Sequence, residues 1–167
     1  TADKGKPVVI IDSGLNDSAS FITSFVATDN REGGRIAARQ MAKLLQGNGK
    51  VAMLRYMQGS ASTMEREEGF LEEIKKTPGI TISSENQYGG ATASQAQDTA
   101  TTLLQSLASA EGLSVQGIYC PNQTTTYGML QALQGKALAG KVKFVGFDCD
   151  ASFLEALKKG EMHGTVL

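Results

Sequence analysis

Short apolar runs alternate along the chain with longer segments in which apolar residues recur at helical spacing. Runs rich in β-branched residues, typical of buried strands, cover residues 7–12, 24–28, 50–54, 80–84, 115–119, 142–147 and 164–167. Helical spacing with polar or glycine ends predicts helices over residues 32–45, 62–76, 91–108, 124–133 and 152–159. The sequence Ser62-Thr63-Met64-Glu65 also predicts a capping box at the start of the second helix.

The order of these elements predicts the fold class. Strands that alternate with helices of this length are joined by crossover connections, which place successive strands parallel to one another. We therefore expect an α/β fold with a doubly wound, mostly parallel sheet whose two faces are covered by helices.

Length and charge narrow the possible functions. The chain has 167 residues, about one domain, and a chain of this size can bury a core without disulfides. Its 16 Lys and Arg against 17 Asp and Glu give a net charge of −1, which argues against the basic surface of a nucleic-acid-binding protein. The apolar runs are far shorter than the ~20 residues of a membrane-spanning helix. We expect neither nucleic acid as a partner nor insertion into a membrane.

Polar side chains gather in the loops that follow the predicted strands. Ligands of doubly wound sheets bind outside the carboxyl ends of the strands, so these loops are the expected place for a site. The loops contain guanidinium, amide, carboxylate and phenol groups: Arg55, Tyr56, Gln58, Arg66, Asn86, Gln87, Tyr88, Asn122, Gln123, Asp148 and Asp150. Such groups suit a neutral polyol, whose hydroxyls donate and accept hydrogen bonds and whose C–H face packs on aromatic rings. The alternative is that Asn, Asp and Ser at these positions only cap helices.

Catalysis has little support in the sequence. The one histidine, His163, precedes the last predicted strand at its amino end, away from the expected ligand edge. Neither a nucleophile elbow nor a Walker loop is present. Asp148-Cys149-Asp150 resembles the Asp-x-Asp motif of haloacid dehalogenase-type phosphotransferases, but that motif usually opens the fold and here it lies near the end. We expect no enzyme, no catalytic residue and no cofactor.

The two cysteines, Cys120 and Cys149, each follow a predicted strand, and the two strands are expected to be neighbours. We expect two free, partly buried thiols, and a disulfide formed in an oxidising compartment is the alternative. Two thiols are too few ligands for a metal site, so no metal is expected.

Several motifs resemble, in order, those of the ribose-type sugar-binding proteins of bacterial ABC importers. The motifs are Val8-Val9-Ile10-Ile11-Asp12, Ala27-Thr28-Asp29-Asn30 with Gly33-Gly34, Gln58-Gly59-Ser60-Ala61-Ser62, Glu65-Arg66-Glu67-Glu68-Gly69-Phe70, Tyr119-Cys120-Pro121-Asn122 and Val145-Gly146-Phe147-Asp148. These importer components are type 1 periplasmic binding proteins, related to the cores of LacI-type repressors. The resemblance covers nearly the whole chain, and the separation between Glu-Arg-x-x-Gly-Phe and Val-Gly-Phe-Asp is its most specific part.

The resemblance implies which side chains hold the sugar. Arg66, Asn122 and Asp148 match residues that hydrogen-bond it, and Tyr88 stands where an aromatic ring stacks on it. Asp12 matches an aspartate contributed by the other lobe. The next residue, Ser13, is a candidate ligand at a position where the family often has Arg. That departure leaves another pentose, a hexose or a cyclic polyol open as the ligand.

The resemblance also implies two lobes that close on a monosaccharide or polyol about hinge strands, with the closed form docking on the membrane permease. We expect residues 1–24 to be a remnant of the amino-terminal lobe, comprising a strand and a crossover, and residues 25–167 to be the carboxyl-terminal ligand-binding lobe. The hinge is expected near residues 25–29 and after Leu167. The implied location is the periplasm, or an extracytoplasmic site with a membrane tether.

Three functions remain as hypotheses. The first is an extracytoplasmic solute-binding protein that captures a sugar between two lobes for ABC-type import. The second is the ligand-sensing core of a LacI-type transcription regulator, and the third is a haloacid dehalogenase-type phosphotransferase. The loops that carry Arg66 and Asn122 favour the first.

Overall fold

A five-stranded parallel sheet forms the centre of the computed structural model, which describes residues 6–14, 22–110 and 112–167. In spatial order the strands are β4 (Ile80–Tyr88), β3 (Gly49–Arg55), β7 (Gly117–Tyr119), β8 (Lys143–Phe147) and β9 (Gly164–Val166). All four pairings are parallel. The order along the chain reverses at β3, which is the arrangement of a doubly wound sheet.

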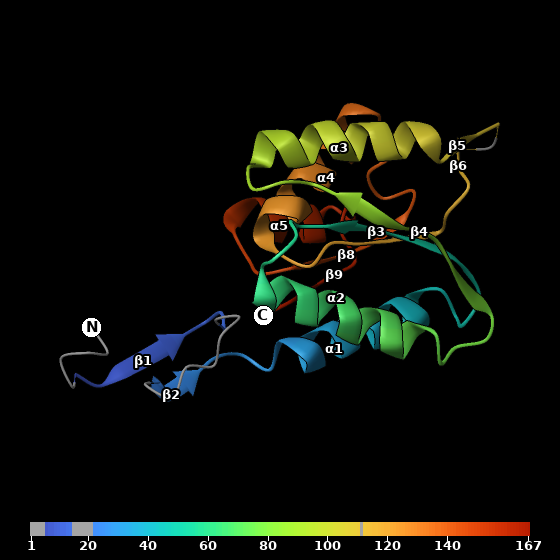
Figure 1. Cartoon of the computed structure of the whole chain (residues 1–167). Coiled ribbons are helices and arrows are strands. Elements are labelled where there is room, and N and C mark those ends of the chain that lie inside the picture. The colour runs from blue at the N-terminus through green and yellow to red at the C-terminus, as the bar shows by residue number, and fades with distance from the viewer. Residues whose placement is uncertain (1–5, 15–21, 111) are drawn as a thin grey trace.

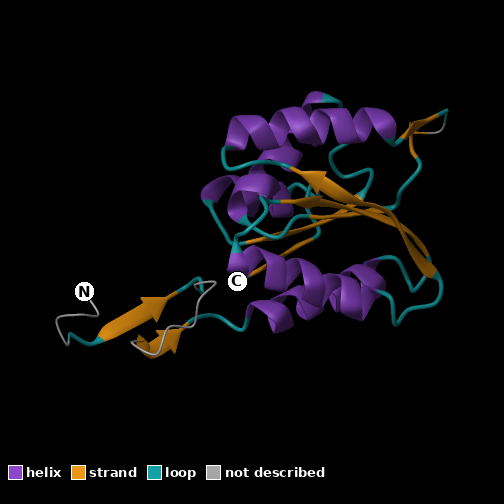
Figure 2. Cartoon of the chain, viewed as in Figure 1, coloured by secondary structure: helices purple, strands orange, loops and turns teal. Residues whose placement is uncertain are grey.

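Helices cover both faces of this sheet (Figures 1 and 2). On one face lie α1 (Asn30–Leu44) and α2 (Ala61–Ile74), and on the other lie α3 (Ala93–Ser106), α4 (Gln123–Gly135) and α5 (Ala151–Lys158). Successive residues of β3 point to opposite faces, so Val51 packs in the core under α1 and α2 whereas Ala52 packs in the core under α3 and α4. The expected α/β, doubly wound architecture is confirmed. None of the described helices has the length and apolar composition needed to cross a membrane.

Helices α1 and α2 pack with their backbones in close contact because two glycines face the partner helix. A Cβ atom at Gly34 would lie 2.0 Å from the carbonyl oxygen of Arg66, and one at Gly69 would lie 2.0 Å from the carbonyl oxygen of Arg31. No side chain fits at either position without moving a helix. The close packing fixes the backbone of Arg66 against α1.

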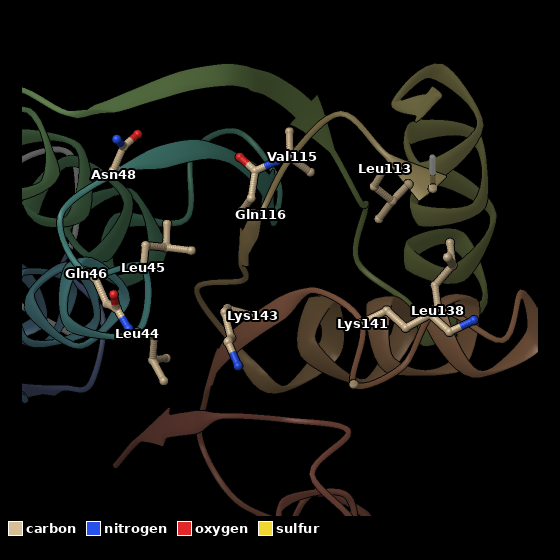
Figure 3. A pocket seen from close by; sticks show the side chains of 12 residues that line it. Leu44, Leu45, Gln46, Asn48, Leu113, Val115, Gln116, Leu138, Lys141 and Lys143 are labelled. Atoms are coloured by element: carbon tan, nitrogen blue, oxygen red, sulfur yellow. The ribbon is translucent and has the colours of Figure 1, made fainter. Parts of the chain in front are cut away.

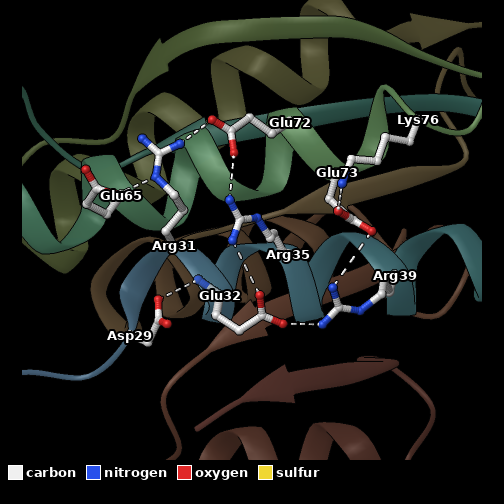
Figure 4. A network of polar contacts seen from close by, with 9 residues as sticks. All are labelled: Asp29, Arg31, Glu32, Arg35, Arg39, Glu65, Glu72, Glu73 and Lys76. Carbon is white, nitrogen blue, oxygen red and sulfur yellow. Dashed lines mark hydrogen bonds and ion pairs between the residues drawn. The ribbon is translucent and has the colours of Figure 1, made fainter.

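The outer face of these two helices carries a network of ion pairs (Figure 4). Arg31 of α1 bonds three glutamates of α2, Glu65 at 2.7 Å together with Glu68 and Glu72. Arg35 joins the network through Glu72 at 3.2 Å. The side chains are about one-third to one-half exposed, and exposed pairs contribute ~0–1 kcal/mol each. The network therefore adds little to the free energy of folding.

A separate two-stranded ribbon precedes α1. β1 (Val8–Ile11) pairs in parallel with β2 (Ile22–Val26), and neither strand pairs with the large sheet. The expected boundary between residues 24 and 25 lies inside β2. Ile11 and Val26 are more than half exposed, so the ribbon leaves apolar side chains without a packed core.

Several elements differ from their predicted ranges by one or two residues at an end, and three differences go further. β4 continues beyond Ser84 to Tyr88, because polar residues are tolerated on an edge strand and the segment stays paired with β3. The capping box is wrong: α2 begins after Ser60, whose side chain makes no capping hydrogen bond. The helix predicted to reach Ala108 ends at Ser106, where β5 (Ala108–Ser109) pairs with β6 (Gly112–Leu113).

Both cysteines are free, as expected, but they differ in environment. Cys120 is fully buried, and burial raises the pKa of its thiol. Cys149 is exposed rather than partly buried. A buried thiol with a raised pKa is a poor nucleophile, so Cys120 serves as a core residue.

His163 connects the start of β9 to β8 and lies at the amino end of β9, as predicted from the sequence. Its main-chain N–H donates to the Phe144 carbonyl at 2.8 Å, and its Nδ1 accepts from the Phe144 N–H at 3.3 Å. Burial and, to a lesser extent, the nearby Lys143 lower the pKa of His163 below its ordinary value of 6.5.

We expect His163 to make stability depend on pH. Since its pKa is lower in the folded chain than in the unfolded chain, its contribution is present above pH 6.5 and is lost as the pH falls through the folded-state value. Thermal unfolding followed by circular dichroism should show a steeper loss of Tm between about pH 7.5 and 5.5 in the unmodified chain than in His163→Gln. Equal slopes in the two proteins would contradict this assignment.

Candidate functional site

Arg66 lies at the carboxyl edge of the sheet, held in place on several sides. It is 8% exposed, and its Nε donates to Asn30 Oδ1 at 2.8 Å. Its Nη1 donates to the Pro121 carbonyl at 3.0 Å, and the guanidinium carbon lies 3.9 Å from the centre of the Phe147 ring. The planar group is therefore fixed by two acceptors and one aromatic face before any ligand arrives.

Asp148 is placed beside Arg66 by the strand that precedes it. Its backbone has φ of 63°, an unusual value for a residue other than glycine, and its N–H donates to the Val166 carbonyl at 2.8 Å. Oδ2 accepts from the Gln123 N–H at 2.9 Å and lies 3.8 Å from Arg66 Nη1. In the described part of the chain, Asp148 Oδ1 and Arg66 Nη2 make no hydrogen bond. The pair thus keeps one acceptor atom and one donor atom without a hydrogen-bond partner among the described residues.

Asn122 begins α4 next to this pair. Its Oδ1 accepts from the Thr125 N–H at 3.1 Å and from the Thr125 hydroxyl at 2.7 Å, so the capping role left open by the sequence is real. Its Nδ2 donates to none of the described residues and is available to a ligand. One side chain therefore caps the helix with its oxygen and offers its nitrogen to the edge of the sheet.

Tyr88 ends the edge strand β4, opposite Arg55. The guanidinium carbon of Arg55 lies 5.7 Å from the centre of the Tyr88 ring, which is 37% exposed. Arg55 is held in turn by Glu67, whose Oε2 accepts from Nη1 at 3.1 Å, and by the Glu85 carbonyl, which accepts from Nε at 2.6 Å. Tyr88 thus belongs to a cluster around Arg55, whereas Arg66 belongs to the cluster around Asp148.

Glu67 is a buried carboxylate that sequence analysis did not single out. It is 1% exposed, and besides Arg55 it accepts from the Tyr56 N–H at 3.1 Å. Burial raises its pKa, and the bonds from Tyr56 and Arg55 only partly offset this. Glu67 follows Arg66 directly in α2. The same turn of helix therefore fixes the distance between the Arg55 cluster, which Glu67 joins, and the Arg66 cluster.

Asp12 and Ser13 lie at the end of β1, away from the sheet. Asp12, whose φ is 71°, lines a cavity of about 360 Å³ that is also bordered by Thr28, Asn30 and Glu65. Ser13 is not among the lining residues; its N–H donates to the Ile11 carbonyl at 2.9 Å. The structure therefore brings Asp12, but not Ser13, to a cavity that reaches the asparagine holding Arg66.

A second cavity, of about 430 Å³, lies at the opposite edge of the sheet (Figure 3). Its walls come from the end of α1 and from the amino ends of β7 and β8, and include Leu44, Leu113, Gln116, Lys141 and Lys143. None of the predicted site residues lines it. Size alone therefore does not locate the site, because the convergent polar groups lie at the carboxyl edge.

Asp150, the second aspartate of the Asp-x-Asp segment, is committed to other contacts. Asp150 Oδ1 caps α5 by accepting from the Ser152 and Phe153 N–H groups, and Oδ2 accepts from Gln123 Nε2 at 3.2 Å. Among the described residues, no group of three or more His, Cys, Asp or Glu is placed to hold a metal ion. This geometry gives the phosphotransferase hypothesis no support.

Comparison with known proteins identifies the family of this chain. A family model described as a periplasmic binding protein domain matches residues 1–167. The ribose import binding protein of Haemophilus influenzae is 30% identical, and the match covers 96% of this chain and 51% of that protein. The D-allose-binding periplasmic protein of Escherichia coli is 31% identical, and the match covers 91% of this chain and 47% of that protein. A solute-binding protein of an ABC transporter from Agrobacterium vitis, solved with bound D-fucose, superposes with a TM-score of 0.86 at 32% identity and covers 95% of this chain and 53% of that one. The chain thus spans about half the length of the curated relatives it matches, and it belongs to the family of periplasmic binding protein domains.

Proposed function

We propose that this chain is part of an extracytoplasmic solute-binding protein that captures a monosaccharide or polyol for an ABC-type importer. The observation that carries the proposal is the Arg66–Asp148 pair, which offers an unused donor and an unused acceptor at one edge of the sheet. Relatives that are named for ribose and allose binding, and a structure that holds D-fucose, support the ligand class. The proposed partner is the membrane permease of the importer.

A sugar fits this pair because adjacent hydroxyls alternate between donating and accepting. Arg66 would donate to one hydroxyl oxygen while Asp148 accepts from its neighbour, and bonds to charged groups are the stronger ones. Asn122 would add a donor through Nδ2. An epimer that misplaces one hydroxyl leaves a buried charged group unpaired, at a cost of ~1–3 kcal/mol. Selectivity among sugars would follow from this penalty.

We further propose that residues 25–167 form one lobe of a two-lobe protein and that residues 1–24 belong with the other lobe. The exposed apolar residues of the ribbon and the half-length match to the relatives support this division. In this arrangement Asp12 and Ser13 would approach the sugar from the second lobe, and Tyr88 would cover its apolar face. Because β1 pairs with β2 as far as Val26, the whole ribbon would belong with the other lobe, and this pairing moves the proposed boundary from residues 24–25 to residues 27–29.

A sugar titration tests the proposal. D-ribose, D-allose, D-fucose and a set of cyclic polyols would be added to the complete product of the gene, with thermal shift as the screen and calorimetry for the affinities. We expect at least one to bind with micromolar or tighter affinity, and the 167-residue chain alone to bind it at least ~100-fold more weakly, because one lobe cannot enclose a ligand.

Two results would overturn these proposals separately. Sub-micromolar binding by the 167-residue chain alone would contradict the two-lobe arrangement. A Mg²⁺-dependent phosphatase activity that is lost in Asp148→Asn, without sugar binding, would contradict the transport function.

A further inference from the structure

Asn30, the first residue of α1, uses both ends of its side-chain amide. Its Oδ1 accepts from Arg66 Nε at 2.8 Å, and its Nδ2 donates to the Thr28 carbonyl at 3.1 Å. The residue is only 8% exposed although it begins a helix. One small buried side chain therefore connects Arg66, the candidate sugar-binding residue, to the segment that precedes α1.

The oxygen of Asn30 restricts how Arg66 can turn. A guanidinium has one Nε–H, and when that donor is committed to Asn30 the plane of the group is set. The Pro121 carbonyl accepts from Nη1 and the Phe147 ring covers one face of the group, so Nη2 is the nitrogen left without a hydrogen bond among the described residues. Without Asn30, Nε–H would have no protein acceptor among the described residues, and the guanidinium would lose one of its two hydrogen bonds to the protein.

The nitrogen of Asn30 acts on the connection between the ribbon and the lobe. Residues 27–29 link β2 to α1, and Thr28 lies in the middle of this link. The neighbouring Asp29 caps α1 by accepting from the Glu32 N–H at 3.0 Å, which fixes one end of the link to the helix. The bond from Asn30 Nδ2 fixes its centre. A change in the link would alter this bond and, through the same amide, the bond to Arg66.

We propose that Asn30 is a positioning residue that couples the conformation of residues 27–29 to the orientation of Arg66. Its effect on affinity rests on the proposed sugar-binding function. When the ribbon and the lobe rearrange around a ligand, a shift of residues 27–29 moves the Asn30 side chain through its bond to Thr28. The bond from Arg66 to Asn30 then changes the orientation of the guanidinium that binds the ligand. Asp12 of the ribbon lines the same cavity as Thr28 and Asn30, so the ribbon and this pair of residues border a common space.

Two substitutions separate the two bonds. Asn30→Ala removes both, whereas Asn30→Asp keeps an oxygen acceptor for Arg66 and loses the donor to Thr28. Asn48→Ala and Asn48→Asp are matched controls, since Asn48 is exposed at the opposite edge of the sheet and its side chain makes no hydrogen bond to any described residue. Asn30→Asp is nearly isosteric, so it keeps the test available if Asn30→Ala folds poorly.

Nuclear magnetic resonance of the ¹⁵N,¹³C-labelled chain without sugar gives the first readout. The Arg66 Nε–H should exchange with water slowly in the unmodified chain and in Asn30→Asp, and at least ~10-fold faster in Asn30→Ala. The Thr28 carbonyl ¹³C resonance should move in both Asn30 variants and stay in place in both Asn48 variants. Unchanged exchange in Asn30→Ala would overturn the positioning role whether or not a sugar binds.

Sugar affinity of the complete gene product gives the second readout. We expect Asn30→Ala to weaken binding of the sugar found in the screen by about 10- to 100-fold, the range for a lost hydrogen bond to a charged group. Asn30→Asp should weaken it about 3- to 10-fold while Arg66 stays protected. Affinity within twofold of the unmodified protein in Asn30→Asp would overturn the coupling, and absence of any sugar binding in the unmodified protein would instead count against the proposed function.

Discussion

Replacing Arg66 by Ala should lower the sugar affinity of the complete gene product at least ~100-fold, equivalent to about 2.7 kcal/mol. The substitution removes the planar donor that would face the ligand, and bonds to charged groups contribute ~1.5–3 kcal/mol each. It also leaves Asp148 without the guanidinium that lies 3.8 Å from its Oδ2. Isothermal titration calorimetry measures the loss directly.

The matched control for this prediction is Arg35→Ala. Arg35 lies on the outer face of α1, and its ion pairs in the described chain are with Glu32 and Glu72, neither of which is a predicted sugar ligand. Its substitution should change sugar affinity less than twofold. Arg66→Lys provides a second comparison, because lysine keeps the positive charge but cannot match the fixed geometry of the guanidinium. If Arg66→Ala binds within fivefold of the unmodified protein, Arg66 is not a sugar ligand.

Glu67→Ala should destabilise the fold by ~3–5 kcal/mol, because removing one partner of a buried ion pair leaves the other uncompensated. Glu67 is 1% exposed and the Arg55 side chain is 18% exposed. Without Glu67, the Arg55 guanidinium has no paired carboxylate among the described residues. The Tyr56 N–H loses its acceptor as well. Urea unfolding followed by circular dichroism gives the free energy of unfolding.

The next residue in α2 provides the control. Glu68 has the same side chain but is 47% exposed, and it pairs with Arg31 on the outer face. Glu68→Ala should therefore change the free energy of unfolding by only ~0–1 kcal/mol. A difference of less than 1 kcal/mol between the two variants would show that the buried pair does not hold the two clusters together.

Most elements of the fold were predictable because their patterns are local. The apolar run that precedes Asp148 is a strand whatever its neighbours are, and the alternation with helices implies a parallel sheet. The mistakes occurred where tertiary contacts override local signals. The polar residues between Ser84 and Tyr88 resemble a loop in sequence, but pairing with β3 keeps them in a strand. Likewise, the Ser-x-x-Glu pattern at Ser62 did not form a cap, because the N-cap residue of α2 is Ser60, two residues earlier.

Part of the candidate site was predictable as a cluster of side chains. The motifs selected Arg66 and Asp148, and the structure brings this pair within 3.8 Å through the order of the strands. Asn30 and Glu67, whose side chains bond Arg66 and Arg55, were not singled out, although both stand inside the quoted motifs. Nothing in their local sequence distinguishes a buried, bonded amide or carboxylate from an exposed one. For Glu67 and Glu68 in particular, only the direction in which each side chain leaves the helix decides the difference.

The sequence by itself determined the class of fold, the edge of the sheet where the candidate ligand groups gather and the resemblance to sugar-binding proteins, because periodicity and motifs are properties of short segments. The tertiary structure alone decided which of those groups are free. Asp150 and the oxygen of Asn122 are occupied by helix capping, whereas Asp148 Oδ1 and Arg66 Nη2 are not bonded in the described chain. A hydrogen bond depends on distances between residues that lie far apart in sequence, and only the folded chain sets those distances.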